Sequence, residues 1–145
     1  MNNLFHHAGS RLVRLGAIAA FGALASLPAL AQTITLSGAN EVPPVTSTAA
    51  GNGTVTVKDD GSVSAKITVS GMTATAAHIH MAAAGANGPV IVPFTKTGDN
   101  TFEAAPGAKL TDAQYESYKQ GKLYVNVHSA KNPGGEIRAQ LKGNM

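Results

Sequence analysis

Residues 53–69, GTVTVKDDGSVSAKITV, decide the fold class, because β-branched and small polar residues alternate on both sides of a turn. A period of two is typical of a half-buried antiparallel strand. The turn signal Asp59-Asp60-Gly61 separates the two alternating runs. The stretch therefore predicts a β-hairpin.

Similar short runs recur along the chain, separated by clusters of Gly, Pro and Asn. Further strands are predicted at residues 33–36, 76–81, 90–94, 101–103, 122–128 and 136–141. About seven or eight short strands predict an all-β fold, namely an immunoglobulin-like or Greek-key β-sandwich. A β-barrel is the alternative architecture. A short crossover helix is predicted from the N-cap Thr111 to Gly121, with Gln114 completing a capping box.

The first 31 residues are predicted to be a cleavable secretory signal peptide. Arg11 and Arg14 precede an apolar, acid-free run that ends in Ala29-Leu30-Ala31, the small-x-small pattern of a cleavage site. An uncleaved membrane anchor is the alternative, but the run is short for a span of about 20 residues. We therefore expect a periplasmic or secreted bacterial protein that begins at Gln32 and has no membrane anchor after cleavage.

Residues 32–145 form one predicted domain, because a chain of this length supports one hydrophobic core. Two of the eleven basic residues lie in the predicted signal, so nine remain against eight acidic residues, a net charge of about +1. No basic run indicates nucleic-acid binding. The chain has no cysteine, which excludes disulfides, thiolate metal sites and cysteine nucleophiles.

Three histidines are the candidate functional residues. His78 and His80 lie one residue apart in Ala-His-Ile-His-Met, and His128 ends Leu-Tyr-Val-Asn-Val-His. Side chains alternate along a strand, so His78 and His80 point to one side, about 6 to 7 Å apart. If the two strands are neighbours, His128 completes a three-imidazole cluster.

The same alternation predicts what surrounds these histidines. Apolar residues of the three strands 76–81, 122–128 and 136–141 fall on one face, the core face. The opposite face carries the histidines together with Asn126, Glu136 and Arg138, which predicts a site on the outer surface. A hairpin across residues 129–135 then places His128 opposite Glu136 and Asn126 opposite Arg138, close enough to surround the metal ligands.

Imidazole nitrogens suit copper and zinc, and three of them leave a coordination position open. We therefore predict a metal site at His78, His80 and His128, with copper as the expected ion and zinc as the alternative. The competing interpretation is that the histidines cover the sheet or bond to nearby loops. Glu136 and Arg138 also have a structural alternative, a cross-strand ion pair.

Three stretches together resemble the CHRD, or chordin-type, domain: residues 36–45 (LSGANEVPPV), residues 77–90 with AHIH and GANGPV, and residues 123–138 with LYVNVH and NPGGEIR. The resemblance covers residues 34–141 with the motifs in the family's order. It implies a secreted or periplasmic immunoglobulin-like β-sandwich, which occurs alone in bacteria and as tandem copies in animal chordin. It implies no defined biochemical activity.

A weaker resemblance links His78, His80 and His128 to copper-ligand positions of copper/zinc superoxide dismutase. Arg138 resembles that family's anion-guiding arginine by position only. The bridging histidine, the zinc loop and the disulfide cysteines of that family have no counterpart here.

Three functions of different classes follow from these patterns. The first is a periplasmic metal-binding protein for copper handling. The second is an enzyme of the superoxide dismutase type, and the third is a structural module that binds another exported protein without metal. The residues favour a non-enzymatic role, since no hydrolase-type catalytic arrangement is present.

Overall fold

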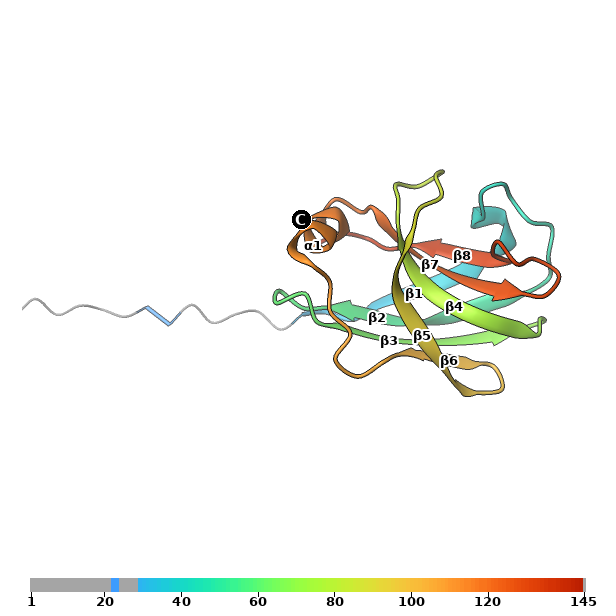
Figure 1. The fold of residues 1–145 in the computed structure, drawn as a ribbon, viewed down its shortest axis with the longest axis horizontal. Coiled ribbons are helices and arrows are strands. Elements are labelled where there is room, and N and C mark those ends of the chain that lie inside the picture. The colour runs from blue at the N-terminus through green and yellow to red at the C-terminus, as the bar shows by residue number, and fades with distance from the viewer. Residues whose placement is uncertain (1–21, 24–28, 145) are drawn as a thin grey trace, which may run out of the picture.

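A closed barrel of eight antiparallel strands forms the described part of the chain (Figure 1). The structure is a computed structural model that describes residues 22–23 and 29–144. The strands are β1 (Gln32–Ser37), β2 (Ala50–Val57), β3 (Val63–Ser70), β4 (Ala74–Met81), β5 (Val90–Gly98), β6 (Thr101–Ala104), β7 (Leu123–Ser129) and β8 (Ile137–Gln140). A short 3-10 helix, η1 (Gly38–Asn40), follows β1, and one α-helix, α1 (Asp112–Lys119), lies between β6 and β7.

The prediction of an all-β fold with about seven or eight strands and one helix is confirmed, with eight strands described, but they close into one barrel where a sandwich was expected. Around the barrel the order is β1-β2-β3-β6-β5-β4-β7-β8. The closing contact joins β1 to β8 through Ser37 and Arg138, residues that lie far apart in the sequence. Strand alternation is the same in sandwiches and barrels, so the sequence pattern does not distinguish them.

The hairpin predicted at residues 53–69 is present as β2 and β3. Their ladder runs from Ala50 opposite Ser70 to Val57 opposite Val63. Gly61 has a φ of +82° in the connecting turn, a conformation that glycine adopts without steric cost.

The predicted helix is also present, with its predicted capping box. The Thr111 side chain accepts a hydrogen bond from the Gln114 backbone N–H, and the Gln114 side chain accepts one from the Thr111 N–H. Figure 1 shows α1 at the end of the barrel where the chain terminates, and the Tyr118 hydroxyl bonds there to Asn144. The helix therefore covers one end of the barrel.

The barrel interior is apolar and uses the core faces that alternation predicts. Ile79 of β4, Val125 of β7 and Ile137 of β8 are fully buried in one cluster with Phe102 of β6. The partly buried Met81 packs against this cluster. The apolar residues of these three strands therefore lie on the core face, as predicted.

The register of β4, β7 and β8 determines which polar side chains lie together on the outer face. In β4 and β7, His78 is opposite Asn126 and His80 is opposite Tyr124. In β7 and β8, Asn126 is opposite Arg138, as predicted. The β7–β8 ladder ends with Val127 opposite Ile137, so the predicted pairing of His128 with Glu136 is not part of it.

Much of this outer face is buried, which corrects the prediction that all of it is exposed, whereas His78 and His128 are only partly buried. Tyr124, Asn126 and Arg138 expose only 2%, 1% and 2% of their areas, and His80 exposes 8%. Strand β7 is consequently buried on both sides along most of its length.

Loops that connect the strands cover the outer face and explain its burial. In the loop of residues 82–89, Asn87 Nδ2 donates a hydrogen bond to the backbone oxygen of Val42 at 2.8 Å, which joins this loop to the one that follows η1. On the other side, the loop after β7 lies against the face through a 2.9 Å contact between His128 Nδ1 and Pro133 O. Strand periodicity does not encode where such loops fold back, so the alternation pattern assigned this face to solvent.

The predicted signal peptide lies almost entirely outside the described residues. Within the described ranges, no helix is both long enough and apolar enough to cross a membrane.

Candidate metal centre

The three predicted histidines lie together on the outer face of two neighbouring strands. His78 and His80 project from β4, and His128 projects from β7, where it is opposite Ala76. His78 Nδ1 and His128 Nε2 are 3.0 Å apart. One ring nitrogen from each of the three residues lies within 4.8 Å of the other two. The predicted cluster is therefore present.

These separations suit a shared ion. Two nitrogens that each lie about 2.0–2.1 Å from one metal ion are roughly 3–4 Å apart. The pair formed by His78 and His128 is already at such a distance, 3.0 Å. Without an ion, the same two nitrogens share one proton in a hydrogen bond, so the cluster has a metal-free form as well.

Backbone carbonyls select the tautomers of two of the three rings. His80 Nδ1 lies 2.9 Å from Gly88 O, and His128 Nδ1 lies 2.9 Å from Pro133 O. A carbonyl oxygen only accepts hydrogen bonds, so each Nδ1 carries the proton and each Nε2 presents its lone pair. Hydrogen bonds of this kind orient the rings of metal-binding histidines.

Burial favours the neutral form of two of the three rings, His78 and His80. Desolvation, followed by the neighbouring His128 and His80, lowers the pKa of His78 from 6.5 to about 4. Desolvation also lowers the pKa of His80, against the opposing effect of its bond to Gly88. Neutral imidazoles can donate lone pairs to a metal ion without first losing a proton.

His80 is the most constrained of the three rings. It stacks on Tyr124 with ring centroids 4.9 Å apart and planes inclined by only 7°. Its Nε2 is buried and has no hydrogen-bond partner, although buried polar atoms are usually paired. His78 and His128 are half-buried, so the cluster reaches solvent through them.

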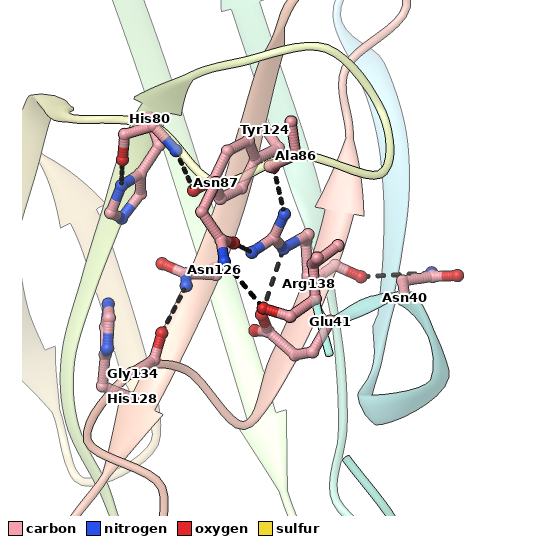
Figure 2. Close-up of polar contacts among 12 residues, drawn as sticks. Asn40, Glu41, His80, Ala86, Asn87, Tyr124, Asn126, His128, Gly134 and Arg138 are labelled. Atoms are coloured by element: carbon pink, nitrogen blue, oxygen red, sulfur yellow. Dashed lines mark hydrogen bonds and ion pairs between the residues drawn. The ribbon is translucent and has the colours of Figure 1, made fainter. Parts of the chain in front are cut away.

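Arg138 lies against the Tyr124 ring and contacts three segments of the chain (Figure 2). Its Cζ is 3.8 Å from the centroid of the Tyr124 ring. Its Nε donates to Glu41 Oε2 at 3.1 Å, and both side chains of this ion pair are 3% exposed. Its two terminal nitrogens donate to Ala86 O and to the Asn87 side-chain oxygen, both in the loop 82–89.

Sequence reasoning missed Glu41, which lies 97 residues before its ion-pair partner. Burial raises the pKa of the Glu41 carboxyl, and Arg138 opposes this effect. The only available signal was an acidic residue directly before the apolar, proline-rich stretch 42–45, which does not identify its partner.

The predicted neighbours of the histidines divide into two groups. Asn126 and Arg138 lie on the histidine face, Asn126 between the rings and the ion pair, as Figure 2 shows. Glu136 instead accepts hydrogen bonds from Ser47, at 2.6 Å, and from Ser129. These bonds, from Ser129 first, lower the pKa of Glu136, so its carboxylate is engaged away from the rings.

The loop of residues 82–89 borders the cluster. Gly88 uses both backbone groups there, because its oxygen accepts from His80 and its N–H donates to the Tyr124 hydroxyl at 3.2 Å. A Cβ atom at Gly88 would lie 1.9 Å from Met81 O. Only glycine therefore fits where the loop contacts the site.

Comparison with known proteins gives one match. The family model described as the CHRD domain matches residues 32–141, which includes the whole barrel and all three histidines. Searches of curated proteins and of solved structures gave no match.

Proposed function

The chain belongs to the CHRD-domain family, and we propose that this member is an exported protein that binds one metal ion between His78, His80 and His128. The observation that carries the proposal is the convergence of three imidazoles, one nitrogen of each within 4.8 Å of the others. Backbone carbonyls select the tautomers of two of these rings, so that their Nε2 atoms are free to bind a metal ion. Such orientation supports a metal site over an accidental cluster of histidines.

Copper is the ion that we propose, with zinc as the alternative. Neutral imidazole is a good ligand for both ions, and the chain has no cysteine to supply a thiolate. Three nitrogen donors leave a position open for a small ligand. A role in copper handling or buffering in the periplasm or outside the cell agrees with the predicted signal peptide.

The test is a competitive titration of Cu(I), Cu(II) and Zn(II) into the purified protein. We expect one-to-one binding that is lost in both His78→Ala and His128→Ala, because each variant leaves only two imidazoles. Thr75→Ala, an exposed position of the same strand β4, is the matched control and should bind like the wild type. Absence of binding by the wild type would refute the proposal and favour a structural or protein-binding module.

A superoxide dismutase-like activity is the second candidate. It rests on the resemblance of His78, His80 and His128 to copper-ligand positions of that family, and the three rings lie together here. The position of Arg138 argues against it. The guanidinium that would attract the anion is 2% exposed and is engaged by Glu41 and the loop 82–89. Copper-loaded protein that removes superoxide no faster than its His128→Ala variant would exclude this activity.

A further inference from the structure

A buried oxygen without a hydrogen-bond partner, Asn126 Oδ1, lies beside the three histidines. Asn126 is 1% exposed, is opposite His78 and precedes His128 by two residues on β7. Its side chain is therefore on the histidine face. Figure 2 shows the amide oxygen on the side of His80 and His128 and the amide nitrogen toward Gly134.

The surroundings of the amide nitrogen fix this orientation. Asn126 Nδ2 donates to Gly134 O at 3.4 Å. The Glu41 carboxylate lies at the same end, since a Cβ on Gly135 would be 2.5 Å from Asn126 Nδ2 and 2.6 Å from Glu41 Oε1. A flipped amide would place its oxygen against two acceptors, so the network assigns the oxygen to the histidine side.

A second buried acceptor without a hydrogen-bond partner belongs to the histidine cluster. His80 Nε2 is buried and has no hydrogen-bond partner, and the proton of this ring is on Nδ1, bonded to Gly88 O. Figure 2 shows the Asn126 amide oxygen on the side of the His80 ring. Two buried acceptors cannot satisfy each other. They are both satisfied by an ion on Nε2 that carries a hydrogen-bond donor toward Oδ1.

We propose, on the basis of the metal site proposed above, that Asn126 Oδ1 faces the coordination position left open by the three histidines and accepts a hydrogen bond from a water molecule bound there. The position then favours ligands that donate hydrogen bonds over anions. Arg138, the cation on this face, has each of its nitrogens engaged by Glu41, Ala86 or Asn87. Asn126 is thus a residue that positions the metal's own ligand.

An isosteric substitution tests the placement of the oxygen. Asn126→Asp replaces the neutral oxygen with a charged one facing the ion and its water, and Glu41→Gln in the same protein supplies an amide donor for the second oxygen. We expect the Zn(II) affinity of this double variant, measured against a chromophoric chelator, to be about tenfold or more above that of Glu41→Gln alone. Asn52→Asp introduces the same charge at an exposed position of β2, which is not a neighbour of β4 or β7, and should leave the affinity unchanged. If Asn126 only supports the loop through its bond to Gly134, the aspartate substitution gives no gain in Zn(II) affinity, and the proposal is wrong.

A second variant keeps the inference testable if the aspartate variant does not fold. Asn126→Ala removes the acceptor, so the bound water becomes easier to displace, and azide should bind the Cu(II) protein up to about tenfold more tightly than it binds the wild type. Azide affinity equal to that of the wild type would overturn the role of Asn126. Wild-type protein that binds no metal would instead remove the proposed function itself, so the two failures are distinct.

Discussion

At the scale of single residues, Arg138 shows how one side chain connects separate segments around the histidines. It pairs with Glu41 after η1, bonds to the loop 82–89 and stacks on Tyr124 of β7. The ion pair is almost fully buried, so its attraction is only weakly screened by water and neither charge can be solvated if the other is removed.

Arg138→Met is therefore expected to destabilise the protein by about 3–5 kcal/mol, because it leaves the Glu41 carboxylate buried without its partner. The free energy of unfolding from urea denaturation measures this loss.

The double variant Glu41→Leu/Arg138→Met removes both charges and should be less destabilised than the sum of the two single variants. Additive losses would mean that the two side chains act independently.

His78 is the residue whose titration links stability to pH. Its pKa is lowered from 6.5 to about 4 by burial and by the two neighbouring rings. Between these values the unfolded chain binds more protons than the folded one, so the free energy of unfolding increases with pH. The metal-free protein should keep this stability above pH 6.5 and lose it as the pH falls toward 4.

His78→Gln removes this titration and should flatten the pH dependence. The comparison is the change in urea midpoint from about pH 7 to about pH 4.5, in the wild type and in the variant. Equal changes in both proteins would show that His78 does not titrate as described.

At the scale of elements, the loop 82–89 contacts the side chains of three barrel strands at the histidine face. Gly88 holds His80 through its carbonyl and Tyr124 through its N–H. Arg138 anchors the same loop two residues earlier, at Ala86. The orientation of the His80 ring therefore depends on the backbone path of a loop.

Gly88→Ala is expected to weaken metal binding by about 10–100-fold, because its Cβ would meet Met81 O and move the carbonyl that orients His80. The measurement is the dissociation constant for Zn(II).

Gly85→Ala in the same loop is the matched control, since its Cβ would meet no atom within 4 Å. Its φ of +82° makes an alanine strained, so a loss of stability is expected there, but metal affinity should be retained. Equal losses of affinity in both variants would place the effect in the loop as a whole.

At the scale of the whole molecule, metal binding should stabilise the barrel. An ion that binds only the folded state raises Tm in proportion to the logarithm of its concentration. We expect Cu(II) or Zn(II) to raise Tm in calorimetry and a chelator to reverse the shift, whereas the triple variant His78→Ala/His80→Ala/His128→Ala should show no shift. A shift that persists in the triple variant would locate binding elsewhere.

Much of the architecture could be predicted from local patterns. Alternation at 53–69 predicted β2 and β3, and Thr111 with Gln114 predicted the helix start. His78, His80 and His128 could be grouped because period two determines the facing of each strand and β4 and β7 are indeed neighbours. These features depend on short-range geometry, which the sequence displays directly.

The remainder depends on contacts between distant segments. Barrel closure joins Ser37 to Arg138, and the buried ion pair joins Glu41 to Arg138. Burial of Asn126 depends on loops without periodicity that fold over β7. No local pattern encodes such contacts, so alternation assigned Asn126 and Arg138 to a solvent-exposed face although both are buried.

The central claim is that three histidines from two strands hold one ion, and pulsed electron paramagnetic resonance of the Cu(II)-loaded protein tests it most directly by counting coordinated imidazoles. Our account predicts three imidazoles in the wild type and two in His128→Ala. A wild-type spectrum without coordinated imidazoles, or a count that does not change in His128→Ala, would contradict it.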